Sequence, residues 1–244
     1  MNNERATLTA EEVRQAGIDD WRQMRAQIKA RFRTGDFVTG LALVNAIGEA
    51  AEAANHHPDI TLTYTDVIVE LSSHDVHGIT DRDLDLARRI SACAAELGIE
   101  ADVSGLTQLE LGLNTGHGEE LAPFYAALLG VDIVRGEPVD KSGQVPTIWW
   151  QDPHDTDQSL ALPEQQFQQR WHFDVWVPQD EAPHRLQAVL DAGGRLVSEV
   201  AAPAYWVVED ADGNRSCICT PAGRSYNQKL WILDLTKPAT YPPS

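Results

Sequence analysis

Cysteine is scarce in this chain of 244 residues, which contains three: Cys93, Cys217 and Cys219. The number is odd and no Cys-x-x-Cys pair occurs, so no disulfide framework is expected. Long apolar runs are also missing, and none reaches the length needed to span a bilayer. The polar start MNNERATLTAEEV lacks the apolar segment of a secretory leader. Together these absences predict a soluble cytoplasmic protein.

Basic residues are few beside the acidic ones, with 19 Lys and Arg against 37 Asp and Glu. Residues 1–103 carry 18 acidic and 10 basic side chains, and residues 104–244 carry 19 and 9. Because both halves repel polyanions, nucleic acid and anionic membranes are not expected as partners. The densest basic run, between Arg22 and Arg33, is interpreted as a solvated face.

The length and the 43% hydrophobic content predict two folded domains, each with its own hydrophobic core. The small, polar stretch ADVSG at 101–105 marks the expected boundary. We therefore expect one domain over residues 1–103 and a second over residues 104–244. Both are predicted to belong to the α+β class.

The first half reads as helices packed on one face of an antiparallel sheet. Thr9 and Glu12 form a capping-box pattern, and KARFRTGDF alternates like a strand that ends at Gly35. Asp36 then caps a helix that Pro58 stops, with an apolar face predicted at Phe37, Leu41, Val44, Ile47 and Ala51.

The stretch TLTYTDVIVELSS is rich in β-branched residues and predicts a strand. Its alternation changes phase between Tyr64 and Val67, which predicts a bulge or bend. Thr80 caps a second long helix that ends at Gly98, with Leu84, Ala87, Ile90 and Ala94 on its core face.

The second half shows a weak internal repeat. A strand at 106–115, a helix at 119–130 and strands at 131–136, 147–153 and 159–163 form the first copy. A strand at 170–178, a helix at 180–194 and strands at 195–200, 204–210 and 216–220 form the second. The order βαβββ therefore occurs twice, and such modules commonly pair into a curved sheet around a pocket.

The stretch EAANHHPDI at 52–60 holds the most chemically suggestive residues. Glu52 and His56 lie four positions apart, which places them on one face of a helix, and His57 follows in the last turn. The next strand ends at SSH, so His74 is expected to lie near the pair. Three histidines with nearby carboxylates suit proton transfer near neutral pH. The spacing alone leaves two other interpretations open. The histidines could have no catalytic or binding role, or they could form a zinc site.

Glu52, His56-His57-Pro58, Tyr64, His74 and Asp83 stand at the spacings of a known family. With LTAEEV, ARFRTGDF and ELSSHDVHGITDRDLDLA around them, the first domain resembles pterin-4a-carbinolamine dehydratase, also called 4a-hydroxytetrahydrobiopterin dehydratase, from end to end. The resemblance implies loss of water from a 4a-hydroxytetrahydropterin, giving quinonoid dihydropterin, without a metal or other cofactor.

The resemblance also implies roles for single residues. His56, His57 and His74 would carry catalysis or grip the pterin, with His56 and His74 as the acid–base pair. Glu52 and Asp83 would support and orient these histidines. The pterin pocket would be lined by positions that match Pro58, Ser73, Asp75 and Val76. His77, in a Gly-containing turn, is expected to be structural or exposed.

In the second domain, ELAPFYAALLGVDIV, RWHFDVWV and VVEDADGNRSCICT resemble the glyoxalase and bleomycin-resistance group, the vicinal-oxygen-chelate superfamily. The usual metal centre of that group needs His or Glu at fixed strand positions. His172 fits one, but the other two positions read as Gln108 and Cys217. We therefore expect a metal-free binding domain.

The leading expectation is a hydro-lyase that recycles a pterin, with the pterin as its small-molecule partner. The resemblance of the first domain to the dehydratase family also implies that the chain forms a homodimer or a higher homo-oligomer. Two alternatives are kept: a non-catalytic pterin-binding or dimerisation module, and an activity that resides in the glyoxalase-like domain as an isomerase, a dioxygenase or a small-molecule binder.

Overall fold

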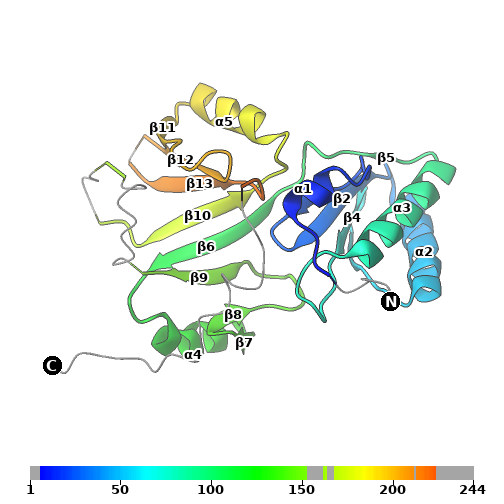
Figure 1. Ribbon diagram of the computed structural model, residues 1–244, viewed down its shortest axis with the longest axis horizontal. Helices are drawn as coiled ribbons and strands as arrows, with labels where there is room; N and C mark the ends of the chain where they lie inside the picture. The colour runs from blue at the N-terminus through cyan, green and yellow to red at the C-terminus, as the bar shows by residue number, and fades with distance from the viewer. Residues whose placement is uncertain (1–5, 153–161, 164–167, 212, 224–244) are drawn as a thin grey trace. The chain divides into compact units, whose positions relative to one another are not determined.

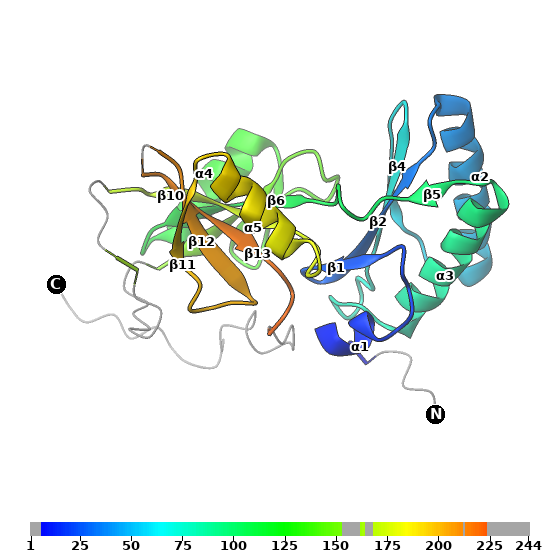
Figure 2. The same cartoon turned by 90° about the horizontal axis from the view of Figure 1, so that it is seen from above.

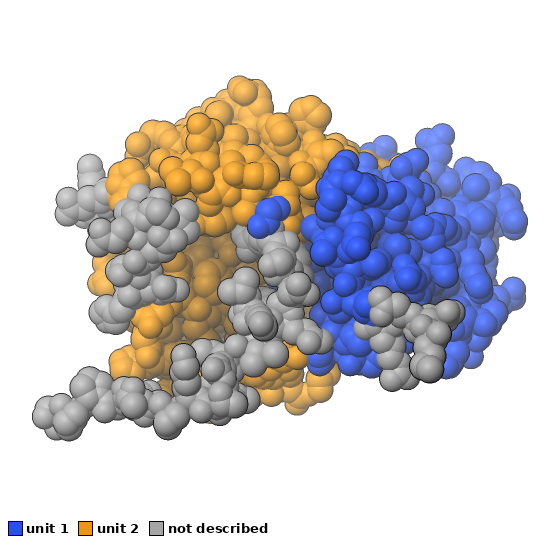
Figure 3. All heavy atoms as spheres, viewed as in Figure 1, with its two compact units in different colours: residues 1–100, 223–244 blue, residues 101–222 orange. Residues whose placement is uncertain are grey.

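A computed structural model of the chain describes residues 6–152, 162–163, 168–211 and 213–223. The described residues form two compact units, which meet in sequence between Glu100 and Ala101 (Figure 3). The first comprises residues 6–100 together with Gly223, and the second comprises residues 101–222. Both units mix helices with sheets, as expected for the α+β class.

The sheet of the first unit is antiparallel along the order β1-β2-β4-β3. Its strands are β1 (Arg22–Met24), β2 (Gln27–Arg33), β3 (Asp59–Leu62) and β4 (Asp66–Leu71), and the short β5 (Glu100–Ala101) also pairs with β2. In β4, Val67, Val69 and Leu71 are buried while the residues between them are half-buried. This alternation gives the sheet one apolar face.

Helices α2 (Phe37–Ala54) and α3 (Asp81–Glu96) pack side by side against one face of this sheet (Figure 2). The predicted core face of α3 is confirmed, because Leu84, Ala87, Ile90 and Ala94 are all buried. The short α1 (Ala10–Arg14) begins at the predicted capping box, in which Thr9 and Glu12 bond each other's backbone N–H groups.

The predicted core face of α2 was partly wrong. Its buried residues are Gly40, Leu43, Ile47 and Ala51, whereas Phe37 and Leu41 are 47% and 45% exposed. The two sets lie on neighbouring faces of one helix, because both follow three- and four-residue steps. Because apolar residues also occupy this second face, the sequence periodicity did not distinguish the buried face from the exposed one.

The phase change at Tyr64 is a hairpin rather than a bulge. β3 and β4 pair antiparallel around a turn at Thr63–Asp66, closed by the Thr63 N–H donating to the Asp66 carbonyl at 2.9 Å. The predicted single strand is therefore two strands.

Helix α2 is, in the part of the chain that the structure describes, the one helix long and apolar enough to cross a membrane by length and composition. The expectation that no apolar run has that length was therefore wrong. Core helices of soluble proteins pass the same test, and Leu43, Ile47 and Ala51 of α2 lie in the core of the unit.

The second unit contains the predicted βαβββ order twice. The first copy comprises β6 (Gln108–Asn114), α4 (Gly118–Leu129), β7 (Asp132–Val134), β8 (Glu137–Val139) and β9 (Thr147–Gln151). The second comprises β10 (Trp171–Trp176), α5 (Ala182–Asp191), β11 (Arg195–Ser198), β12 (Tyr205–Glu209) and β13 (Arg215–Cys219). The strand β8 was not predicted, and most of the predicted strand at 159–163 lies outside the described residues.

The two copies join through their first strands. In the sheet order β11-β12-β13-β10-β6-β9, β6 pairs antiparallel with β10, and each pairs in parallel with the last strand of its own copy (Figure 1). β7 and β8 form a separate two-stranded sheet.

Both helices of the second unit pack on one face of the sheet. Tyr125 of α4 contacts the rings of Trp150 and Trp171, and Leu186 and Val189 of α5 pack with Val175 and Ile218. Because side chains alternate along strands, the opposite face carries a different set. It presents Glu110, Gly112, Trp149, His172, Asp174, Trp176 and Cys217.

Candidate active site

His56 lies just beyond the end of α2 rather than in its last turn. Asn55 adopts a left-handed conformation with φ of 48° and ends the helix, and the His56 N–H donates to the Ala51 carbonyl. The chain leaves the helix there, which turns the imidazole of His56 toward the start of α3. Its Nε2 lies 2.7 Å from Oδ1 of Asp83.

The Asp83 carboxylate is fully buried and accepts several hydrogen bonds. Its Oδ2 accepts from Ser73 Oγ at 2.7 Å, from the Thr80 N–H at 2.7 Å and from Thr80 Oγ1 at 3.1 Å. The bond to the Thr80 N–H completes the capping box of α3. Asp83 thus joins the end of α2, the loop after β4 and the start of α3.

The tautomer of His56 follows from this contact. A buried carboxylate surrounded by donors acts as an acceptor, so Nε2 of His56 carries the proton that it shares with Asp83. Among the described residues, Nδ1 of His56 has no hydrogen-bond partner. That atom is free to exchange a proton with a bound molecule.

His57 contacts Glu52, which the sequence placed beside His56 instead. Its Nε2 lies 3.1 Å from Glu52 Oε1, and the two side chains are 56% and 81% exposed. The half-buried Pro58 follows. The pair lies at the surface, where a carboxylate orients an imidazole without burying it.

The loop after β4 holds the other predicted residues. Ser73 is buried and bonded to Asp83, whereas His74 and Asp75 are exposed and Val76 is half-buried. Asp75 Oδ1 accepts from Arg82 Nη2 at 2.6 Å. No polar contact joins His74 to another residue in the described chain. Ser73, the residue before His74, shares the Asp83 carboxylate with His56.

His77 is exposed and has a positive φ of 52°. The backbone reverses here, with the Ser73 N–H donating to the Gly78 carbonyl at 2.8 Å. The ring of His77 makes no hydrogen bond or ion pair with another described residue, which makes this residue a suitable control for the other histidines.

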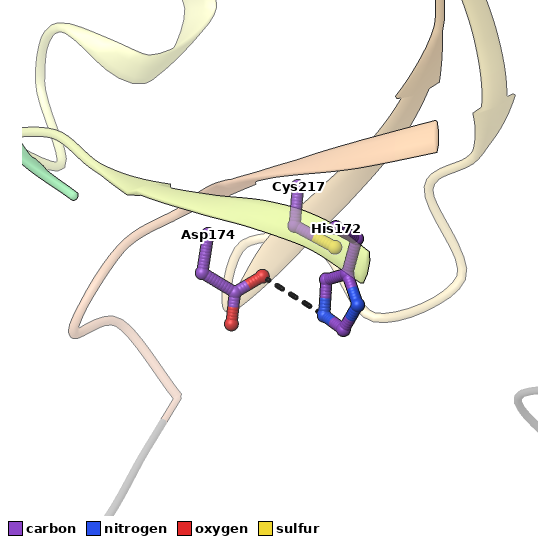
Figure 4. Close-up of side chains that lie close together, drawn as sticks. All are labelled: His172, Asp174 and Cys217. Carbon is purple, nitrogen blue, oxygen red and sulfur yellow. Dashed lines mark ion pairs between the residues drawn. The ribbon is translucent and has the colours of Figure 1, made fainter. Parts of the chain in front are cut away.

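The second unit places its predicted residues in a different cluster. His172, Asp174 and Cys217 bring one potential ligand atom each to within 4.8 Å of one another (Figure 4). Burial lowers the pKa of His172, and the Asp174 carboxylate opposes that shift. A hydrogen bond with Cys219, together with burial, raises the pKa of the Cys217 thiol well above its ordinary value.

Gln108 lies on the same face of the sheet as this cluster, but further along its strand. The register places Gln108 opposite Trp176, whereas Glu110 stands opposite Asp174 and Gly112 opposite His172. Glu110 Oε2 instead accepts from the Trp176 indole N–H at 2.8 Å.

Comparison with known proteins decides the family of the first unit. Residues 6–93 match the family model of pterin 4 alpha carbinolamine dehydratase. A Thermosynechococcus vestitus protein named "Putative pterin-4-alpha-carbinolamine dehydratase" is 40% identical over 83 residues, which cover 34% of this chain and 87% of that protein. The chain belongs to the pterin-4a-carbinolamine dehydratase family.

Another relative of this pterin dehydratase family member comes from Gloeobacter violaceus. It is 43% identical over 86 residues, covering 33% of this chain and 94% of the relative. A solved structure described as a transcriptional coactivator/pterin dehydratase from Brucella melitensis is 31% identical, covers 36% of this chain and 99% of that one, and has a TM-score of 0.35. The family relationship supports a pterin dehydratase-like role for the first unit.

The second unit of this pterin dehydratase family member matches a glyoxalase-like domain model over residues 110–219. The resemblance to both families is thereby confirmed.

Sequence reasoning missed Thr80 as a partner of Ser73 and Asp83, and Asp174 as a neighbour of His172. Thr80 was seen only as a helix cap, although its hydroxyl also lies 2.8 Å from that of Ser73. Asp174 stands two residues after His172 on one strand, and that spacing was the signal that both point to the same face.

Proposed function

We propose that the first unit dehydrates a 4a-hydroxytetrahydropterin to quinonoid dihydropterin by histidine acid–base catalysis. The observation that carries this proposal is the 2.7 Å contact between His56 Nε2 and the fully buried Asp83 carboxylate. The contact fixes one ring nitrogen and leaves Nδ1 for the substrate. Because the carboxylate is fully buried, it holds the imidazole in one orientation.

The reaction needs two proton transfers. The C–O bond of the carbinolamine breaks as its hydroxyl accepts a proton and leaves as water, while a ring nitrogen loses its proton and a C=N bond forms. Nδ1 of neutral His56 accepts the ring proton, and Asp83 stabilises the imidazolium that results. Protonated His74 donates to the departing hydroxyl. Each turnover leaves His56 protonated and His74 neutral, and proton exchange with solvent restores their starting protonation states.

The remaining predicted residues bind the substrate in this proposal. His57, held by Glu52, grips the pterin at the edge of the site, and Pro58, Asp75 and Val76 line the pocket. Ser73 acts through its bond to Asp83, since its side chain is buried. No step requires a metal or another cofactor.

Stopped-flow absorbance of 4a-hydroxytetrahydropterin breakdown tests the proposal. The wild-type chain should accelerate the loss of water, and His56→Ala and His74→Ala should each lose on the order of 100-fold or more of that rate. His77→Ala, which changes an exposed residue three positions after His74, should keep the wild-type rate. Far-UV circular dichroism of each variant checks folding.

Two outcomes would redirect the search. Full turnover in both His56→Ala and His74→Ala would overturn the acid–base assignment. A wild-type chain that binds pterin without accelerating its breakdown would leave a binding or dimerisation module, and the catalytic question would move to the glyoxalase-like unit.

We also propose that the chain forms a homo-oligomer through α2. Phe37, Val38 and Leu41 are 47%, 78% and 45% exposed on this helix, and adjoining exposed apolar side chains mark interaction surfaces. Light scattering after size-exclusion chromatography should give a multiple of 26.9 kDa, and Val38→Glu should lower that mass. A wild-type mass equal to one chain would refute the proposal.

A further inference from the structure

The second unit exposes an apolar strip on the side of its sheet that carries α4 and α5. In the antiparallel pair of β6 and β10, Leu111 stands opposite Phe173 and therefore points to the same face. Leu109 and Trp171 lie two positions away on their strands and join that face. Phe173, Leu109 and Trp171 are 52%, 40% and 37% exposed, and Leu111 is half-buried. We call these four residues the β6–β10 strip.

Aromatic side chains extend the strip onto α4. The ring centroids of Trp171 and Tyr125 lie 5.6 Å apart, and those of Tyr125 and Phe124 lie 5.1 Å apart. Phe124 is itself 62% exposed. Aromatic residues are enriched in the cores of interfaces, and connected apolar patches on a protein surface mark interaction sites. The β6–β10 strip therefore has the composition of a binding surface.

The chain contains an apolar stretch, outside the described residues, that suits this surface. Residues 224–244 read RSYNQKLWILDLTKPATYPPS, and LWILDL at 230–235 holds five apolar residues and one acid, Asp234. Contact of so many apolar side chains with water is unfavourable, so a stretch of this composition favours an apolar surface. The exposed strip and the apolar stretch of the same chain are complementary in this respect.

The charges of the two partners are opposite. Residues 224–244 hold three basic residues and one acidic residue, whereas residues 1–223 hold 16 basic and 36 acidic ones. The short segment is therefore positive, and the rest of the chain is strongly negative. Because opposite charges attract, the segment is drawn toward the surface of the chain.

Acidic side chains lie near both ends of the strip. α4 starts shortly after β6 ends and carries the exposed Glu119 and Glu120 in its first turn. α5 starts shortly after β10 ends, and Asp180 and Glu181 precede it. Because β6 and β10 run in opposite directions, the two helix starts lie at opposite ends of the strip. β6 and β10 can be followed between the two helices in Figure 1.

The segment is long enough to reach the strip. β13 runs parallel to β10, so the chain leaves the sheet at the end of the strip where α5 starts. β10 and β6 lie one and two strands away, about 5 and 10 Å. Seven residues from Gly223 to Leu230 span up to about 23 Å when extended. LWILDL spans about 20 Å, which covers the roughly 14 Å from Leu109 to the level of Trp171.

We propose that residues 229–237 dock on the β6–β10 strip of the same chain, with Lys229 beside the acidic start of α5 and Lys237 beside that of α4. The apolar side chains of LWILDL then cover the exposed rings of the strip. The inference is independent of the dehydratase activity proposed for the first unit. It also concerns a different apolar surface from the one proposed on α2 for the homo-oligomer.

Photo-crosslinking on the full-length chain tests this docking. Phe173 is replaced by p-benzoylphenylalanine, the protein is irradiated, and the cross-linked peptides are identified by mass spectrometry. We expect the probe to react with residues 229–237 in a product that keeps the 26.9 kDa mass of one chain. The same probe at Phe37, a phenylalanine of α2 that is 47% exposed, should not react with that segment.

Lysine variants of the Phe173 probe chain test the charge contribution. Lys229→Glu combined with Lys237→Glu should lower the cross-link yield at least about threefold, because both ends of the segment then meet like charges. Lys141→Glu changes an exposed lysine that contacts Asp132 instead, and it should leave the yield unchanged. Sodium chloride at about 1 M should lower the yield of the parent probe chain in the same direction.

Hydroxyl-radical labelling needs no unnatural residue, so it keeps the inference testable if the probe chain does not fold. Trp231→Asp in the otherwise natural chain removes the largest apolar side chain of the segment. The oxidation of Phe173 should then rise at least about twofold, while that of Phe37 stays constant.

Three results would each overturn the proposal. A cross-link from the Phe173 probe only to a second copy would make the strip a contact between chains. The lack of any product with residues 229–237, or the same product from the Phe37 probe, would show that the segment does not select the strip. Equal oxidation of Phe173 in the wild type and in folded Trp231→Asp would refute the docking as well.

Discussion

Asp83 holds His56 through one carboxylate oxygen and caps helix α3 through the other. The same side chain therefore sets the direction of a proposed proton acceptor and satisfies a backbone N–H at a helix start. Its substitution should affect both activity and stability.

Asp83→Asn should lower both quantities. The amide has one oxygen, so it cannot accept from His56 and from the Ser73 and Thr80 donors at once. The loss of a buried hydrogen bond should reduce the free energy of unfolding by about 1–3 kcal/mol. Urea unfolding and turnover, measured on the same preparation, check this.

Asp85→Asn is the matched control on the same helix. Its carboxylate is 69% exposed and, among the described residues, bonds only the nearby Arg88. The change should alter stability by less than about 0.5 kcal/mol and leave turnover intact. Equal effects of the two substitutions would show that the buried network has no special role.

Glu52→Gln should affect substrate binding more than folding. The contact with His57 is exposed, and surface pairs of this kind contribute about 0–1 kcal/mol. We expect a raised KM with a nearly unchanged kcat and an unchanged unfolding midpoint. A large fall in kcat with constant KM would instead place His57 in the chemical step.

Acid should weaken the first unit partly through Asp66. Hydrogen bonds from Thr65 and Arg31 lower the pKa of this carboxyl from its ordinary value of 3.8. Because the pKa is lower in the folded chain, the stabilisation is present above about pH 4 and disappears as the pH falls toward the folded-state pKa. Unfolding midpoints across this range should fall more steeply for the wild type than for Asp66→Asn. Parallel curves would contradict the assignment.

Gly112→Ala should disturb the glyoxalase-like unit. The new methyl group would collide with the imidazole of His172, which Trp149 also confines. Overpacking of this kind costs about 1–3 kcal/mol. Urea unfolding of the variant beside the wild-type chain measures this loss. Gly116→Ala offers a control, because a Cβ there would meet nothing within 4 Å.

Much of the first unit follows from local signals in the sequence. The capping residues Thr9, Asp36 and Thr80 mark the helix starts correctly, because short polar side chains there satisfy backbone N–H groups in place. The repeat of the second unit was also readable, since each copy carries its own periodic pattern.

The misplaced features depend on backbone geometry that residue types express weakly. The turn at Thr63–Asp66 contains no glycine, proline or asparagine, so nothing separated β3 from β4. Asn55 has a left-handed backbone conformation that changes the direction of the chain after α2. As a result, His56 contacts Asp83 and His57 contacts Glu52. Likewise, the pairing of Glu110 with Asp174 depends on sheet register, which is set by contacts across the whole unit.

Asp83 both orients His56 and stabilises the start of α3, and this affects how relatives of this chain should be compared. A relative that had lost all catalytic activity would still gain stability from an aspartate at this position, because its carboxylate completes the capping box of α3. Retention of Asp83 is thus a poor indicator of enzymatic competence. The imidazole of His56 is different, since its Nδ1 bonds nothing in the described fold. Folding requires only that some donor reach Oδ1 of Asp83, which does not by itself demand an imidazole with a second, unbonded nitrogen. The presence or loss of that ring is therefore the more informative marker of a working site.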